Sequence, residues 1–299
     1  MRCLITGGSG FIAAWIMRRM VAHDVQFRVL DTRTDSRLSE QLLGEAARTI
    51  EWVPGDISDP RAVTAAARDC ELIVHLAAVL TPACQADPIR GAEINLLGSL
   101  NIFRAAIECD IPRVVYMSSA GVFGPNDGTY PMPTTHYGAF KLAVEGCARS
   151  FWENEGIASV GFRPFIVYGP GREVGLTAGP TLACQAAASG EPYVIPFSGE
   201  ADMVFVDDVA AAFVEAWLNP TSDAKVYNLT GEVATAEHMA STISELAPEA
   251  NISAAGPLLP VTANIEPGSV RTDYPGIPLT SLREGLGKTL TFYQQSRAT

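Results

Sequence analysis

A glycine-rich segment directly after the first apolar run constrains the fold more than any other part of the sequence. Residues 2–6 read RCLIT, a strand pattern, and TGGSGFIAA at 6–14 leads from it into a helical pattern. Gly7 permits a tight turn, Gly10 leaves room for a phosphate at the helix N-terminus, and Ala13 allows close packing. This order of strand, loop and helix predicts a dinucleotide-binding turn, with a ligand-free structural turn as the alternative.

Strand and helix patterns alternate through the first half of the chain. Short β-branched runs that read as strands follow the first one at 26–31, 49–53, 71–77, 113–119 and 159–164. Longer helical patterns separate them, including one over 92–108 and one around Tyr137. Such alternation makes a parallel sheet covered on both faces, with ligands at the carboxyl ends of the strands. We therefore predict an α/β fold with a doubly wound parallel sheet of the Rossmann type.

The rhythm changes after Pro164, where glycines and prolines crowd residues 169–200. We predict that residues 1–168 form the nucleotide-binding domain and residues 169–299 a smaller C-terminal substrate-binding lobe. Residues 203–218 are expected to return to the sheet of the first domain.

Composition excludes several classes of protein. The net charge of −12 repels nucleic acid, and no apolar run reaches the 18 or so residues of a membrane span. The six cysteines form no C-x-x-C pair and read as reduced thiols, which favours the cytoplasm. The four histidines show no metal-ligand spacing, so we expect no metal site.

Asp31 ends the second predicted strand and follows the glycine loop by about 20 residues. Its carboxylate can accept hydrogen bonds from both hydroxyls of an adenosine ribose and would repel a 2'-phosphate, which favours NAD over NADP. Arg33, two residues later, could instead meet such a phosphate. Phe11 and Ile12, which open the first helix, are expected at the cofactor as well.

A second acidic residue, Asp56, follows the third predicted strand in PGDISD. It is placed to accept a hydrogen bond from the adenine amino group while Ile57 packs on the ring. An aspartate that caps a turn or helix before Pro60 is an equal alternative.

Tyr137 and Lys141 lie four residues apart in THYGAFKLAVEG, a segment that otherwise reads as helix. Side chains at this spacing rise from the same face of a helix. A phenol with its ordinary pKa of about 10 is a poor base at neutral pH unless a neighbouring cation stabilises the phenolate. Taken alone the pair is typical of an ordinary helix face, so its meaning depends on the motifs around it.

Taken together, the motifs resemble those of the extended short-chain dehydrogenase/reductase family, in particular its NAD-dependent epimerase/dehydratase branch. The matching elements follow the family's order and spacing: TGGSGFIA, the GD after the third strand, HLAA at 75–78, INLLGS at 94–99, SSAGVFG at 118–124, Y-x-x-x-K at 137–141 and RPFIVYGPG at 163–171. The rest of the chain matches more loosely.

The resemblance implies a catalytic set. In it Tyr137 exchanges the proton, Lys141 binds the nicotinamide ribose and lowers the pKa of Tyr137, and Ser119 binds the reacting oxygen. These roles agree with the chemistry, because oxidising a secondary alcohol with NAD requires removal of the hydroxyl proton as hydride leaves the same carbon. A strand-end bystander is the alternative for Ser119, and for Ser118 the structural role is favoured.

Further cofactor contacts are implied by the same resemblance. Leu76, Ala77 and Ala78 would give NAD room across the sheet edge, and Tyr168 would border the nicotinamide mainly through main chain. Asn95 either organises backbone and water behind the site or is a satisfied core residue.

The leading interpretation is an NAD-dependent oxidoreductase that moves hydride at a secondary alcohol carbon of a sugar, a sugar acid or a related hydroxy compound. A nucleotide-sugar epimerase or dehydratase with tightly bound NAD is one alternative, and a catalytically idle NAD-binding sensor is another, which the intact catalytic set disfavours. The family also implies a homodimer through the helices near Ala92 and Tyr137, although the apolar stripe of LAVEGCARSFW would serve a core equally well.

Two departures from the family pattern bear on the substrate. Nucleotide-sugar enzymes of the family usually carry an arginine where this chain has Ala201 and another where it has Glu266, both contacting the substrate diphosphate. Arg172 and Arg271 are the remaining candidate cations, and either could bind the carboxylate of a small sugar acid. We therefore expect a small hydroxylated substrate without a nucleotide, with Arg172 among its contacts.

Overall fold

Seven parallel strands form the central sheet of the computed structural model, which describes residues 1–298. The strands are β1 (Arg2–Thr6), β2 (Gln26–Asp31), β3 (Glu51–Pro54), β4 (Leu72–His75), β5 (Arg113–Met117), β6 (Ala158–Pro164) and β10 (Ala224–Leu229). Their order is β10-β6-β5-β4-β1-β2-β3, so the chain winds outward in one direction from β1 and in the other from β4. This confirms the predicted Rossmann-type fold, and a ligand is expected where the winding reverses, at the carboxyl ends of β1 and β4.

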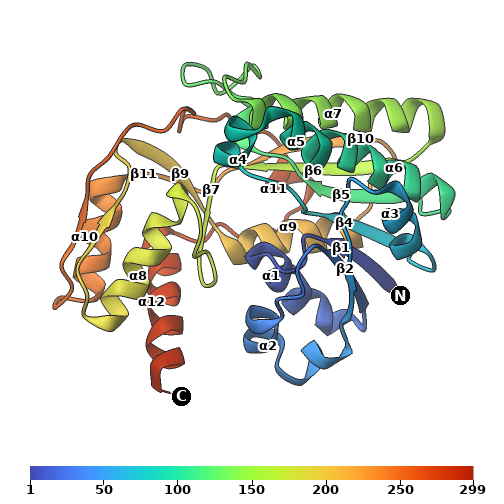
Figure 1. Cartoon of the computed structure of the whole chain (residues 1–299). Coiled ribbons are helices and arrows are strands. Elements are labelled where there is room, and N and C mark those ends of the chain that lie inside the picture. The colour runs from blue at the N-terminus through green and yellow to red at the C-terminus, as the bar shows by residue number, and fades with distance from the viewer. Residues whose placement is uncertain (299) are drawn as a thin grey trace.

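Helices cover both faces of this sheet, as its buried strands require (Figure 1). On one face α1 (Phe11–Met20) packs against α2 (Arg37–Leu43) and α9 (Val206–Leu218); on the other lie α3 (Pro60–Ala67), α6 (Gly98–Glu108) and α7 (His136–Glu155). Each face has its own cluster of buried apolar side chains. The two helix layers fix the strand ends, whose loops carry the candidate site residues.

The helical pattern predicted over 92–108 is not one regular α-helix. A π-helical stretch, Glu93–Leu97, contains the buried Asn95 and lies between α5 (Pro88–Ala92) and α6. α4 (Thr81–Ala86) precedes α5. Such π-helical turns are frequent at functional sites.

A second lobe follows β6 and contains short strands and four helices. Its three-stranded sheet has the order β11-β9-β7, and two further strands pair in parallel. The elements are β7 (Ile166–Tyr168), α8 (Gly179–Ser189), β8 (Tyr193–Ile195), β9 (Glu200–Phe205), β11 (Glu232–Thr235), α10 (Ala236–Leu246), β12 (Ile252–Ala254), α11 (Val270–Asp273) and α12 (Leu282–Ala298). Figure 1 shows α8, α10 and α12 to the left of the central sheet.

The chain returns from this lobe to the central sheet. Residues 203–205 stay in the small sheet as the end of β9, whereas α9 packs against α1. β10 then pairs with β6 as the seventh strand of the central sheet. The domain boundary at residues 168 and 169 stays a prediction. Within residues 1–298 no helix combines the length and apolar character that crossing a membrane requires.

Candidate active site

The glycine loop between β1 and α1 has the backbone geometry that an anion-binding turn requires. Gly7 has a left-handed backbone with φ of 72°, and a Cβ built on it would lie 2.7 Å from the backbone nitrogen of Ala77. No side chain could therefore stand between the two loops that follow β1 and β4. Gly10 caps α1 with extended backbone and no side-chain bond, which leaves N–H groups of the first helical turn, from Phe11 and Ile12 onward, to bind a phosphate.

Asp31 is fixed beside this loop. The Ser9 N–H donates to Asp31 Oδ2 at 3.0 Å, and the Arg33 N–H donates to Oδ1 at 3.1 Å. The carboxylate stays half-buried, while the Arg33 side chain is exposed. A free helix N-terminus, a glycine cradle and an acid at the end of β2 are the donor and acceptor set that NAD requires, so the residues present fit this cofactor.

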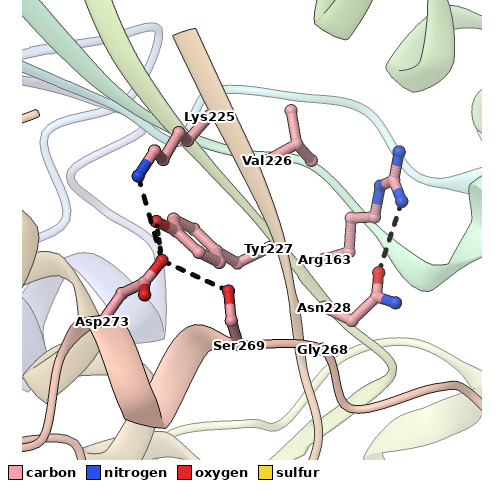
Figure 2. Close-up of a pocket in the computed structure, with 8 residues that line it drawn as sticks. All are labelled: Arg163, Lys225, Val226, Tyr227, Asn228, Gly268, Ser269 and Asp273. Carbon is pink, nitrogen blue, oxygen red and sulfur yellow. Dashed lines mark hydrogen bonds and ion pairs between the residues drawn. The ribbon is translucent and has the colours of Figure 1, made fainter. Parts of the chain in front are cut away.

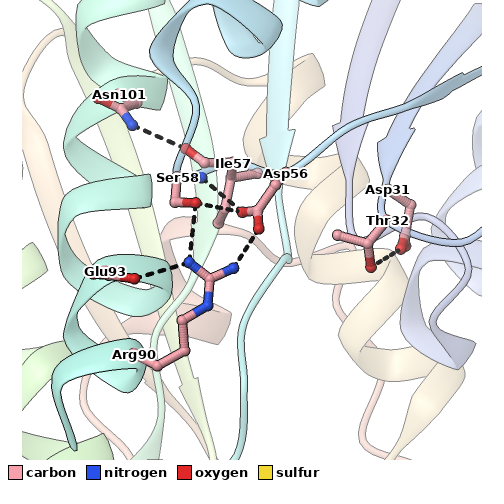
Figure 3. A network of polar contacts seen from close by, with 8 residues as sticks. All are labelled: Asp31, Thr32, Asp56, Ile57, Ser58, Arg90, Glu93 and Asn101. Atoms are coloured by element: carbon pink, nitrogen blue, oxygen red, sulfur yellow. Dashed lines mark hydrogen bonds and ion pairs between the residues drawn. The ribbon is translucent and has the colours of Figure 1, made fainter.

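Figure 3 shows that Asp56 already has two sets of donors. The Ser58 N–H and hydroxyl both donate to Oδ1 at 2.8 Å, and Arg90 pairs with Oδ2 while also donating to Glu93 at 2.9 Å. Burial alone would raise the pKa of the Asp56 carboxyl, but these donors outweigh it and lower that pKa. Ile57 is buried, with only 4% of its surface exposed. The structure thus shows the turn role of Asp56, and its adenine contact, like that of Ile57, stays a prediction.

A chain of buried polar groups runs behind the glycine loop. Thr6 Oγ1 shares a hydrogen bond with His75 Nδ1 at 2.7 Å, and His75 Nε2 shares one with Ser99 Oγ at 2.9 Å. Ser99 donates in turn to the Asn95 carbonyl at 2.7 Å. Burial lowers the pKa of His75 to about 3, with the charge of Lys141 acting in the same direction, so this ring is neutral at physiological pH.

Asn95 is a satisfied core residue, one of its two expected roles. Its Oδ1 accepts the Val79 N–H at 2.9 Å, and its Nδ2 donates to the Val79 carbonyl at 2.9 Å and to Cys84 Sγ at 3.1 Å. These bonds occupy the amide. Any effect of Asn95 on NAD would pass through the main chain of residues 76–79, which includes Leu76, Ala77 and Ala78.

The structure brings Ser119, Tyr137 and Lys141 together at the carboxyl end of β5. β5 stops at Met117, two residues before the end of the predicted strand, so Ser119 lies in the loop that follows. Ser119 Oγ and the Tyr137 ring both lie within 3.5 Å of a Cβ built on Gly121, and Lys141 Nζ lies 5.8 Å from the centre of the Tyr137 ring. Ser119 Oγ also accepts the Gly121 N–H at 3.0 Å. The four-residue spacing on α7 thus serves a shared site.

Close contact between α7 and the Ser119 loop depends on a glycine that sequence reasoning did not single out. A Cβ on Gly138 would collide with the carbonyl oxygen of Gly121. Thr135 caps α7 by accepting the Gly138 N–H at 3.1 Å. The only sequence signal for this contact was the small residue directly after Tyr137.

Burial shifts both ionisable groups of the set. It raises the pKa of the Tyr137 phenol, which the neighbouring Ser119 hydroxyl and the charge of Arg172 oppose. It lowers the pKa of Lys141 to about 8, against the charge of Glu145. Lys141 Nζ donates to the Met117 carbonyl at 2.7 Å. Tyr137 can therefore act as a base only if neighbouring positive charges stabilise its phenolate.

Arg172 provides such a charge from the loop after β7. Its guanidinium lies 5.3 Å from the centre of the Phe11 ring and interacts electrostatically with Tyr137. One terminal nitrogen donates to Thr177 Oγ1 at 3.1 Å, while the buried Nε has no hydrogen-bond partner within residues 1–298. No carboxylate of the described chain pairs with it. Arg172 therefore offers an unused donor next to Tyr137.

Other expected contacts are placed differently. The Tyr168 side chain is fully buried, and its hydroxyl donates to the Leu282 carbonyl at 3.5 Å, so only its main chain is left for the predicted nicotinamide contact. Arg271 donates to the main-chain carbonyls of Thr230, at 2.8 Å, and Pro278. Arg271 thus stabilises the C-terminal lobe, which leaves Arg172 as the stronger candidate for a substrate anchor.

Neither of the two positions that depart from the family pattern carries a cation itself, although the charge of Arg271 acts on Asp202 beside the first. Ala201 is fully buried in β9, and beside it the buried Asp202 accepts the Gly231 N–H at 2.6 Å. Burial raises the pKa of Asp202 to about 6. Glu266 is exposed in the segment before α11. Both positions therefore lack the cation that would meet a diphosphate.

A hollow of about 370 Å³ lies along the outer edge of β10 (Figure 2). Its lining comprises Arg163, Lys225, Val226, Tyr227, Asn228, Gly268, Ser269 and Asp273. Its polar groups bond to one another, as in the 2.7 Å hydrogen bond from the Tyr227 hydroxyl to Asp273. No member of the catalytic set lines it. Within residues 1–298 no group of acidic, histidine or cysteine side chains is placed to hold a metal.

This fold and site define an NAD-dependent enzyme. A model of the NAD-dependent epimerase/dehydratase family matches residues 3–230, so the chain belongs to that family and the predicted family, cofactor and enzyme class are confirmed. Among curated relatives, the UDP-glucose 4-epimerase of Mycolicibacterium smegmatis is 28% identical over 315 residues, covering 98% of this chain and 99% of the relative. A decarboxylating sterol-4-alpha-carboxylate 3-dehydrogenase of Candida albicans is 29% identical over 188 residues, about half of either chain.

Solved structures agree on the fold. The Thermus thermophilus UDP-glucose 4-epimerase, in complex with NAD, superposes with a TM-score of 0.85 at 24% identity and covers 98% of this chain and 99% of that one. The Thermotoga maritima UDP-glucose 4-epimerase, with UDP-glucose, gives 0.86 at 22% identity and covers 99% and 100%. These likenesses extend the shared fold over the C-terminal lobe, where sequence motifs were weakest.

Proposed function

We propose that this protein is an NAD-dependent dehydrogenase of a small hydroxylated acid, such as a sugar acid, and that it releases both the oxidised product and NADH. The observation that carries the proposal is Arg172, a half-buried arginine beside Tyr137 whose Nε is buried without a hydrogen-bond partner and which pairs with no carboxylate of the described chain. A buried charge without a partner is costly, so the site favours a ligand that brings an anion.

A carboxylate suits Arg172 because a guanidinium presents its donors in one plane that matches the two carboxylate oxygens. The unused Nε gives such a ligand at least one donor. Charge-assisted bonds of this kind contribute about 1.5 to 3 kcal/mol each. A diphosphate, by contrast, would find Ala201 and Glu266 where the family supplies arginines.

Each residue of the catalytic set has a task in the proposed reaction. When bound, NAD supplies an oxidised nicotinamide that accepts hydride from the alcohol carbon. Tyr137 takes the hydroxyl proton, and Ser119 binds the same oxygen and restricts its position relative to the phenol. The charge of Arg172 favours the phenolate. Lys141, which the Met117 carbonyl holds in place, has the same role by resemblance to the family.

A nucleotide-sugar epimerase or dehydratase is the second candidate. The near-complete coverage of a UDP-glucose 4-epimerase by this chain favours it. The two candidates differ in what they release, since an epimerase returns the hydride and retains its cofactor. Absorption of NAD in the purified protein and calorimetry with UDP distinguish them: retained cofactor and micromolar UDP binding would favour the epimerase.

The test of the proposed substrate class pairs substrates and variants. Initial rates of NADH formation are compared between each hexuronic acid and its parent hexose. The wild type should prefer the acid, and Arg172→Gln should raise KM for the acid by about 10²-fold while leaving NAD affinity nearly unchanged. Arg283→Gln, which removes an exposed arginine paired with Glu245, is the matched control. Loss of NAD affinity in Arg172→Gln alone would instead assign this residue to the cofactor.

Assembly and location complete the proposal. We propose a cytoplasmic homodimer formed through α6 and α7. Partly exposed apolar side chains of α7, among them Phe140, Cys147 and Trp152, support such an interface, and the described cysteines are free thiols, as in a reducing compartment. Light scattering of the purified chain tests the dimer.

A further inference from the structure

A buried ion pair lies behind the catalytic set, and the proposed chemistry uses neither of its members. Glu145, one turn after Lys141 on α7, is only 7% exposed. Arg163, on β6, donates to both carboxylate oxygens, through Nε at 2.7 Å and through a terminal nitrogen. Ser118 donates its hydroxyl hydrogen to Glu145 Oε1. Because Ser118 immediately precedes Ser119, the carboxylate is bonded to the catalytic loop.

The same ion pair continues outward to the C-terminal lobe. Arg163 also donates to Asn228 Oδ1 at 3.3 Å, and Asn228 Nδ2 donates to the Glu266 carbonyl at 2.7 Å. Figure 2 shows Arg163 and Asn228 on the same side of the hollow beside β10. Glu145 therefore joins four parts of the molecule: α7, the catalytic loop, the neighbouring strands β6 and β10, and the segment before α11.

We propose that Glu145 is a positioning residue that holds Ser119 in place relative to Tyr137 and Lys141. Three consecutive residues at the end of β5 lie against α7. The Met117 carbonyl accepts from Lys141 Nζ, Ser118 donates to Glu145, and Ser119 lies beside the Tyr137 ring at Gly121. A displacement of about 1 Å in a reacting group can cost about 10²-fold in rate, so the bond between Ser118 and Glu145, directly before Ser119, should matter for turnover.

The Glu145 carboxylate also acts on Lys141 by charge. Burial lowers the pKa of Lys141, and the negative charge of Glu145 opposes that shift. The other groups facing Lys141 are Tyr137 on the same helix, Cys84 on α4 and His75 on β4. Burial keeps the phenol and the thiol protonated and the imidazole neutral. Removing the Glu145 charge should therefore make Lys141 lose its proton at a lower pH.

Two kinds of variant test this role. Ser118→Ala removes one hydrogen bond and keeps the ion pair; it should lower kcat about tenfold with NAD affinity within about twofold, and Ser118→Thr should restore kcat. Glu145→Gln should lower kcat by about 10²-fold and move the alkaline limb of the kcat/KM profile to lower pH. If Glu145→Gln fails to fold because Arg163 is left unpaired, the double variant Glu145→Gln/Arg163→Gln replaces it. If the double variant also fails to fold, the Ser118 variants alone test the positioning role.

Asp208→Asn is the matched control, because Asp208 is an equally buried carboxylate that accepts two bonds from Thr280 outside the site. It should lower the melting temperature and leave kcat and the pH profile unchanged. The inference rests on the proposed catalytic set, so Tyr137→Phe is measured alongside, and a Tyr137→Phe enzyme of normal rate would refute the set itself. With Tyr137→Phe inactive, wild-type kcat and pH profile in the Ser118→Ala and Glu145 variants would overturn the positioning role, even if they melt earlier.

Discussion

Lys141 Nζ donates a 2.7 Å hydrogen bond to the main-chain carbonyl of Met117, which joins the middle of α7 to the end of β5. This bond fixes the ammonium beneath the Tyr137 ring and next to the loop that carries Ser119. The geometry of proton transfer therefore depends on a buried cation whose charge is itself sensitive to pH, and the first prediction follows from that sensitivity.

The kcat/KM of the enzyme should fall above about pH 8, because burial lowers the pKa of Lys141 to about 8 and the neutral amine no longer favours phenolate. The effect on the fold has the opposite sign. The unfolded chain keeps this proton up to the ordinary value of 10.5, so between about 8 and 10.5 the Lys141 contribution to stability increases with pH. Lys141→Met should lose most activity, and its kcat/KM should no longer fall above about pH 8. A wild-type kcat/KM that still rises at about pH 10 would contradict the assignment of the alkaline limb to Lys141.

Tyr137→Phe should reduce turnover by about 10² to 10⁴-fold, because it removes the proton acceptor and keeps the ring. NAD affinity should change little, which a fluorescence titration of both proteins measures. Near-normal turnover of Tyr137→Phe at every pH would mean that another group takes the proton.

NAD should bind much more tightly than NADP, because the Asp31 carboxylate is held by the Ser9 and Arg33 N–H groups where a 2'-phosphate would lie. Titration of both dinucleotides measures the ratio. Asp31→Asn should reduce it, and Arg33→Gln, a change at an exposed side chain, should not. Equal affinities in the wild type would show that Arg33 determines the choice.

The free energy of unfolding should decrease on acidification through His75. Burial lowers the pKa of the folded ring to about 3, below its ordinary value of 6.5, so the unfolded chain binds more protons between these values and stability falls as pH falls. The loss from this group should be about 2 kcal/mol at about pH 5. Urea unfolding at several pH values measures this loss. His75→Gln should flatten the pH dependence of the free energy of unfolding, and His23→Gln, a change at an exposed side chain, should leave that dependence unchanged. A steep acid dependence retained in His75→Gln would assign it to other groups.

Local motifs predicted the fold well because each one contains residues that a particular local backbone geometry requires. Gly7 is needed where the backbone is left-handed and touches Ala77, and Asp31 stands where the strand ends. Strands of the central sheet were visible as apolar runs because both of their faces are buried. β10 joined the sheet unforeseen, since a strand that arrives after an excursion through a second lobe carries no sign of its partner.

The candidate catalytic set could be predicted because its members stand at the spacings of a known family, whereas the partners that support it could not. Arg90 reaches Asp56 across 34 positions, and Arg163 reaches Glu145 across 18. Pairs of this kind are decided by tertiary packing, so either charged residue reads as an ordinary surface position in the sequence. The burial of the Tyr168 side chain against the start of α12 was equally invisible in the sequence, and its expected main-chain contact with the nicotinamide stays a prediction.

Steady-state NADH formation from free hexuronic acids tests the central claim most directly. The account predicts that the purified protein, supplied with NAD, converts at least one such acid with accumulation of NADH equal to the acid consumed, and that Arg172→Gln abolishes the preference for the acid over its parent hexose. Interconversion of UDP-hexoses without net NADH, together with no turnover of any free acid, would contradict it.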